Sequence, residues 1–130
     1  MMSNAEILKR IATISEHDTR YKKEAYLFIL VALEYTLSKL EVRRHLTGQE
    51  LSRGIAGFAR EQYGCMAKLV LENWGITSTG DFGEIVYLLI EHGLLSKTDE
   101  DSKEDFTEVY SFDDEFGWNN FTITDIPDRL

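Results

Sequence analysis

Apolar residues recur at every third or fourth position from residue 5 to residue 92, and glycines interrupt this pattern. A period near 3.6 residues places such side chains on one face of an α-helix, so the pattern predicts a succession of helices around a shared core. Glycine is favoured just beyond a helix C-terminus because it adopts positive φ angles freely. Gly64, Gly75 and Gly93 each follow an apolar stripe and are predicted helix ends.

The predicted helices are 5–16, 22–40, 47–63, 66–74 and 79–92. Thr47 and Glu50 have the spacing of a capping box, which marks the start of the third helix. A chain of 130 residues is typical of one domain. We expect residues 1–116 to form that domain, and residues 117–130 to form a tail whose order the sequence does not decide.

The pattern changes after Gly93. Residues 94–97 are short enough for a strand, residues 98–105 are almost all polar, and residues 107–112 alternate between apolar and polar side chains. Helices followed by a polar-tipped hairpin are typical of a winged helix-turn-helix. The expected fold class is therefore α+β, mostly helical and winged-helix-like, with a short acidic β-hairpin. The alternative is an all-α domain in which residues 102–106 form one more helical turn.

Charge is distributed unevenly along the chain. The net charge of −9 combines a first half (residues 1–68) with 11 basic and 8 acidic residues and a second half with 3 basic and 15 acidic residues. The second half is therefore repelled by nucleic acids and by anionic membranes. The longest apolar run, residues 25–33, is too short to span a bilayer, and residues 1–10 lack the apolar stretch of a signal peptide. One cysteine, Cys65, excludes an intrachain disulfide, so we expect a cytoplasmic location.

Several short segments resemble those of a known bacterial family. They are Arg43–Leu51, Glu61–Gly64, Trp74–Gly75, Asp81–Val86 and Gly93–Thr98. In these segments the chain resembles the uncharacterised Minf-type family of small bacterial proteins. The resemblance implies a bacterial source and one domain. It transfers no site residues, because the family has no established activity.

Winged-helix proteins usually read DNA with the last helix before the hairpin, through Arg, Lys, Asn or Gln side chains. The corresponding segment, residues 79–92, contains no lysine or arginine and presents Asp81, Glu84 and Glu91 instead. The sequence therefore argues against this mode of DNA binding.

Two groups of charged residues are candidate binding surfaces. The acidic group is a possible surface for a basic partner and comprises Asp99, Glu100, Asp101, Glu104 and Asp105. The basic group is a possible surface for nucleic acid or for a partner and comprises Arg43, Arg44, Arg53 and Arg60. The alternative for the acidic group is a solvated run of charges. The alternative for the arginines is that they are solvated or pair with acidic residues of the same chain.

No motif for catalysis or metal binding is present. Cys65 and the three histidines, His17, His45 and His92, have no base or ligand at a useful spacing. His92 precedes a predicted helix end, where a positive charge is favoured. We therefore expect no catalytic residue, cofactor or metal. The favoured function is a protein-interaction or assembly module with a protein partner or a second copy. Nucleic-acid binding through the four arginines is the alternative.

Overall fold

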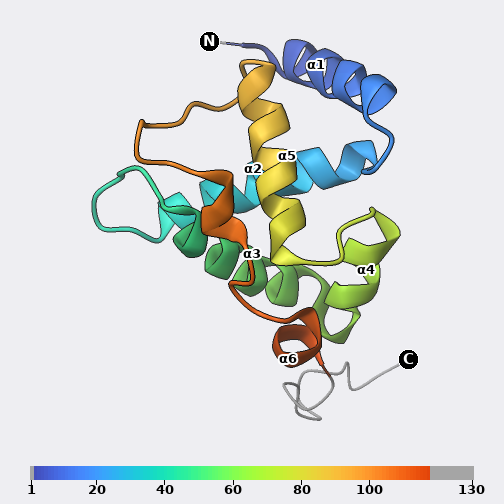
Figure 1. The fold of residues 1–130 in the computed structure, drawn as a ribbon, viewed down its shortest axis with the longest axis vertical. Helices are drawn as coiled ribbons and strands as arrows, with labels where there is room; N and C mark the ends of the chain where they lie inside the picture. The colour runs from blue at the N-terminus through green and yellow to red at the C-terminus, as the bar shows by residue number, and fades with distance from the viewer. Residues whose placement is uncertain (1, 118–130) are drawn as a thin grey trace.

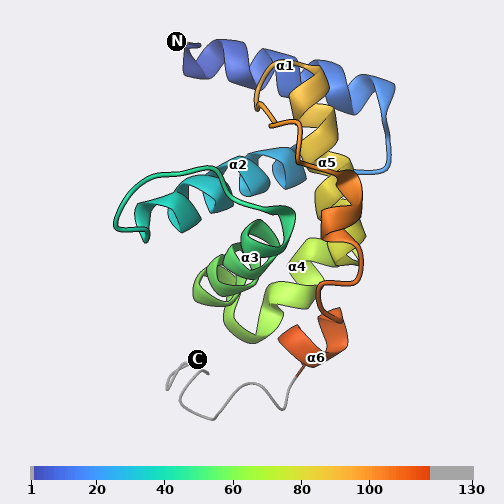
Figure 2. The ribbon, with the colours of Figure 1, turned by 60° about the vertical axis from the view of Figure 1, so that its left-hand side comes forward.

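The computed structural model describes residues 2–117, and every regular element in this range is a helix. The elements are α1 (Asn4–His17), α2 (Lys23–Ser38), α3 (Gly48–Tyr63), the 3₁₀ helix η1 (Gly64–Met66), α4 (Ala67–Asn73), α5 (Thr79–Glu91), the 3₁₀ helix η2 (Lys103–Phe106) and α6 (Phe112–Phe116). Helices α1 and α6 lie at opposite ends of the molecule, and α5 runs between them (Figures 1 and 2). The predicted tail, except Gly117, lies outside the described residues.

The helix ends follow local sequence rules, and the predicted helices are confirmed to within a few residues. The Thr47 side chain accepts a hydrogen bond from the Glu50 backbone, and the Glu50 side chain accepts one from Thr47, so the capping box at α3 is present. The predicted glycine ends Gly64, Gly75 and Gly93 have positive φ angles of 53°, 96° and 77°. Within residues 2–117, no helix combines the length and the apolar character needed to cross a lipid bilayer.

One apolar core joins the helices. Tyr26 and Ile29 of α2, Ile55 of α3 and Leu89 of α5 are fully buried in it. Helices α2 and α3 approach closely at Gly54, where a β-carbon would meet the side chain of Thr36. The buried faces of α2, α3 and α5 are those that the apolar periodicity predicted.

The expected α+β, winged-helix-like fold is wrong, and the all-α alternative is confirmed. No strand is present in the part of the chain that the structure describes. Where the hairpin was expected, Ser102 and Asp105 form a capping box that starts η2. Residues 102–106 thus form the additional helical turn of the alternative.

The position of Phe106 explains this difference. Phe106 is 5% exposed and lies against two glycines, Gly48 at the start of α3 and Gly83 in the first turn of α5. A β-carbon at either glycine would come within 3.0 Å of Phe106. Burial of the ring between these two helix starts stabilises a helical turn at residues 103–106, where the polar residues had predicted the tip of a hairpin.

Candidate functional site

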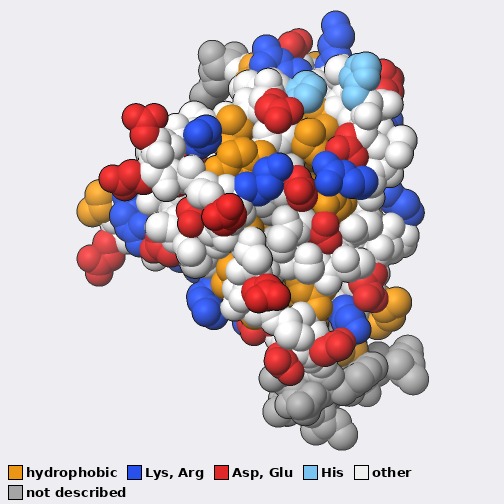
Figure 3. Space-filling model, in the orientation of Figure 1, with side chains coloured by type: hydrophobic (Ala, Val, Ile, Leu, Met, Phe, Trp, Pro, Cys, Tyr) orange, Lys and Arg blue, Asp and Glu red, His pale blue; other side chains and the backbone are white. Residues whose placement is uncertain are grey.

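A pocket of about 200 Å³ lies under residues 94–106, which we call the strap. Helices α2, α3 and α5 and the loop before α3 form the rest of its wall. Its lining residues are Leu33, Leu37, Arg44, His45, Leu46, Thr47, Gly48, Leu51, Val86, Tyr87, Ile90, Leu95, Ser96, Lys97, Asp101, Ser102, Asp105 and Phe106. In Figure 3, hydrophobic side chains lie between charged ones on the part of this face where the strap and α5 meet.

Helical spacing produces the apolar walls of this pocket. Leu33 and Leu37 lie one turn apart on α2, and Val86 and Ile90 lie one turn apart on α5. Residues four apart share one face of a helix, so each helix presents a pair of aliphatic side chains to the pocket. Leu95 of the strap is half-buried and adds to the same wall.

A hydrogen-bonded latch fastens the strap to the loop before α3. Asp101 Oδ2 lies 2.6 Å from His45 Nε2 and accepts a hydrogen bond of 2.8 Å from the backbone N–H of Thr98. Burial opposes ionisation of Asp101, but the hydrogen bonds from Thr98 and His45 outweigh it and hold the pKa of this carboxyl below its usual range. The carboxylate is therefore ionised at neutral pH, and it keeps the strap above the pocket.

Arg44, which also lines the pocket, is held by an acidic partner. Its guanidinium donates to both carboxylate oxygens of Glu50, at 3.0 and 2.6 Å. This bidentate pair, with the Thr47 backbone N–H, lowers the pKa of Glu50 to about 2. The guanidinium of Arg44 therefore already has an acidic partner within the chain.

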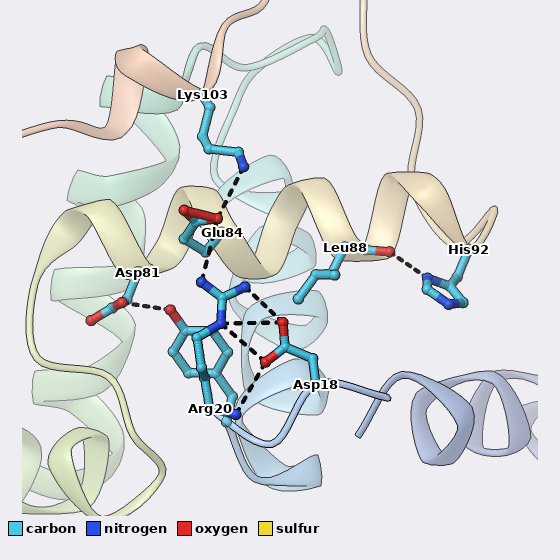
Figure 4. Close-up of polar contacts among 8 residues, drawn as sticks. Asp18, Arg20, Asp81, Glu84, Leu88, His92 and Lys103 are labelled. Carbon is cyan, nitrogen blue, oxygen red and sulfur yellow. Dashed lines mark hydrogen bonds and ion pairs between the residues drawn. The ribbon is translucent and has the colours of Figure 1, made fainter. Parts of the chain in front are cut away.

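A second polar network attaches the strap to α5 (Figure 4). Lys103 donates to Glu84 at 3.0 Å, and Arg20 lies between Glu84 and Asp18, with bonds of 2.7–3.1 Å to Asp18. Nearby, Tyr21 donates to Asp81, and burial followed by this bond raises the pKa of Tyr21. These charges satisfy one another, so the network positions the strap and offers little to a ligand.

The predicted basic surface is mostly engaged within the chain. Arg43 pairs with Glu34 at 2.9 Å, Arg44 pairs with Glu50, and Arg60 pairs with Glu115 at 2.5 Å. Arg53 is exposed and has no ion pair within residues 2–117. Of the four predicted arginines, the structure brings only Arg44 to the pocket.

The predicted acidic surface divides into two parts. Asp101 and Asp105 line the pocket, whereas Asp99, Glu100 and Glu104 are exposed outside it. These three outer carboxylates form no ion pair with any residue that the structure describes. Two of the five predicted acidic residues therefore belong to the pocket, and the other three lie outside it.

Two of the remaining chemical candidates, His92 and Cys65, lie at helix ends. His92 is the C-cap of α5, as expected for a positively polarised side chain there, and its Nδ1 donates to the Leu88 carbonyl at 2.9 Å. Cys65 is half-buried in η1. No group of three or more His, Cys, Asp or Glu residues is arranged to hold a metal ion within residues 2–117.

Sequence reasoning missed most of the pocket. Tyr87 was recognisable only as a residue outside the apolar stripe of its helix, and Leu95 only as part of an expected strand. The sequence did contain one relevant signal. Apolar residues cover a wide part of the surface of α2 and of α5, which indicates that each helix has more than one apolar neighbour. That signal does not say where the faces meet.

A search of protein-family models found no match to this chain, and searches of curated proteins and of solved structures likewise found none. The resemblance to the Minf-type family stays a prediction.

Proposed function

We propose that this protein is a non-enzymatic interaction module that binds a segment of a protein partner at the pocket under the strap. The observation that supports this best is the meeting of separately predicted charged residues, Arg44, Asp101 and Asp105, around one pocket with apolar walls. Such a combination of apolar walls and a few fixed polar groups is typical of binding sites.

The size of the pocket favours a side chain over a larger ligand. Pockets for drug-sized molecules usually measure about 300–1,000 Å³. A cavity of about 150 Å³ already accommodates a benzene ring. A pocket of about 200 Å³ therefore fits one large side chain, which points to a protein segment docking on the surface and inserting one residue.

The charge of the surrounding surface favours a basic partner. The strap, residues 94–106, contains five acidic residues and two lysines. A surface of this sign attracts a positively charged segment and repels nucleic acid. Nucleic-acid binding through Arg43, Arg44, Arg53 and Arg60 ranks second, because three of these arginines already have acidic partners. We infer a cytoplasmic setting from the single cysteine, Cys65.

The test is capture of the partner with a matched pair of variants. Ser96 is exposed and lines the pocket, so Ser96→Trp is expected to fill it. Ser38→Trp places the same side chain on an exposed position of α2 outside the pocket. The tagged full chain is incubated with nuclease-treated lysate, and the captured protein is purified and titrated calorimetrically against each variant.

We expect one stoichiometric partner that binds the wild type and Ser38→Trp equally and binds Ser96→Trp at least about tenfold more weakly, a difference of about 1.4 kcal/mol. A second copy of this chain as the only partner would indicate self-assembly. Complete loss of bound material after nuclease treatment would support the nucleic-acid alternative and contradict the proposal.

A further inference from the structure

We infer that the group entering the pocket is a long basic side chain, lysine or arginine, of the partner protein. This inference rests on the proposed function and specifies the chemistry of its site. The pocket combines aliphatic walls with two carboxylates, Asp101 and Asp105, which belong to the strap.

The two carboxylates differ in how far the chain already uses them. Asp101 accepts from His45 and from both the backbone and the side chain of Thr98. Asp105 uses Oδ2 for the backbone N–H of Ser102 at 3.2 Å, and its Oδ1 accepts no hydrogen bond from a residue within 2–117. An acceptor position on Asp105 therefore remains available to a donor that enters the pocket.

A second polar group among the lining residues lacks a partner. The hydroxyl of Tyr87 is buried and forms no hydrogen bond with the described residues. Burial, and next the proximity of Asp101 and Asp105, raise the pKa of this phenol, so it is neutral at physiological pH. An unsatisfied buried hydroxyl costs about 1–3 kcal/mol, and a ligand that donates to it would recover part of this energy.

No lysine or arginine of the described chain forms an ion pair with these carboxylates, although His45 lies 2.6 Å from Asp101. Arg44 is paired with Glu50, and Lys103 is paired with Glu84 and lies 5.7 Å from the centre of the Tyr87 ring. Among the lining residues only Lys97 is a cation without an ion pair in the described chain, and it is exposed. Asp105 forms no ion pair within residues 2–117.

Lysine and arginine match both parts of the pocket. Their aliphatic stems cover apolar surface while their heads form charge-assisted hydrogen bonds. A purely apolar side chain would desolvate both carboxylates and leave the Tyr87 hydroxyl unpaired, which is unfavourable. The exposed Asp99 and Glu100 beside the pocket would also attract other basic residues of the same segment.

The test compares pentapeptides that differ only at their central residue, which is lysine, arginine or the uncharged isostere norleucine. Each is titrated into the ¹⁵N-labelled full chain, and amide shifts of Tyr87, Asp101 and Ser102 are followed by NMR. We expect the basic peptides to bind at least about fivefold more tightly than the norleucine peptide. Asp105→Asn keeps an acceptor for Ser102, so it should remove this preference without unfolding the strap.

Glu104→Gln is the matched control, because Glu104 is exposed and does not line this pocket. It should leave the preference unchanged. The inference is overturned if norleucine binds as tightly as lysine, if Asp105→Asn keeps the preference, or if no peptide shifts the pocket amides. In each of these cases the proposed function still stands if the captured partner binds Ser96→Trp more weakly than it binds Ser38→Trp. Equal binding of free n-butylammonium and the lysine peptide would indicate a small amine in place of a protein partner.

Discussion

The helical body, α1 to α5, and the strap are held in place by different kinds of contact. In the body, fully buried aliphatic residues such as Ile29, Ile55 and Leu89 recur along several helices, so each contact has neighbours that support it. The strap has one fully inserted anchor, Phe106, supplemented by the Asp101 latch and surface ion pairs. This difference indicates that the body determines the fold, whereas the ring of Phe106 determines where the strap lies over the pocket.

The largest expected effect comes from removing that ring. Phe106→Ala should lower the free energy of unfolding by about 3–5 kcal/mol, because it empties the space between Gly48 and Gly83 and breaks contacts with both α3 and α5. It should also detach the strap. Chemical denaturation measures the first effect, and amide hydrogen exchange of residues 94–106 measures the second.

Leu69→Ala serves as the control, since Leu69 is 59% exposed and should change stability by less than about 0.5 kcal/mol. If Phe106→Ala were equally mild and hydrogen exchange in the strap stayed slow, the comparison would fail. The latch and ion pairs would then be sufficient to hold the strap.

An intermediate effect should distinguish two glycines on α3. A β-carbon at Gly54 would lie 2.0 Å from Thr36 Oγ1, whereas a β-carbon at Gly57 would meet nothing within 4 Å. We expect Gly54→Ala to destabilise the fold by about 1–3 kcal/mol through overpacking between α2 and α3. Gly57→Ala should stabilise it by up to about 1 kcal/mol through higher helix propensity. Thermal unfolding of both variants measures the difference, and a destabilised Gly57→Ala would contradict this account.

The sequence predicts the body because its helices are locally encoded. Caps such as Thr47 and stripes such as that of α5 fix where each helix begins and which face is buried. Two glycines three residues apart within a helix suggest a close backbone approach, and the structure has one at Gly54 but not at Gly57. In the predicted helix 66–74 the apolar spacing points Leu69 inward, yet Leu69 is 59% exposed. With seven residues, α4 has fewer than two full turns, so its periodicity does not define a buried face.

The strap and the candidate site depend on contacts that a local pattern does not encode. Residues 107–112 alternate like a strand, yet Phe112 begins a helix and packs on Phe82 of α5, with ring centroids 5.8 Å apart. Asp101 and Arg44 were predicted as parts of two separate surfaces, and they share a pocket only because α2, α3 and α5 cross beneath the strap. How these helices cross depends on side-chain packing across the core, which a local sequence pattern does not contain. The charge pattern therefore identified Asp101 and Arg44 but not their arrangement around one pocket.

The smallest expected effect is the acid sensitivity of the strap latch. The pKa of Asp101 is lower in the folded chain than its usual value, because Thr98 and His45 donate to the carboxylate. The latch therefore contributes stability above the unfolded pKa of about 3.9, and this contribution is lost as the pH falls through the lower folded pKa. Unfolding by urea between pH 6 and pH 2.5 should show a steeper loss of stability in the wild type than in Asp101→Asn.

Asp99→Asn is the matched control, because Asp99 is an exposed acid on the same strap without an ion pair within residues 2–117, and it should keep the wild-type slope. Glu50→Gln makes the corresponding test in the body, where the pKa of Glu50 is about 2. Both carboxylates are partly solvated, so each effect should stay below about 1 kcal/mol. Amide hydrogen exchange distinguishes the two effects. As the pH falls, protonation of Asp101 should first speed exchange in the strap, and only protonation of Glu50 should speed exchange at the start of α3. Simultaneous exposure of both would mean that the strap is not an independent unit.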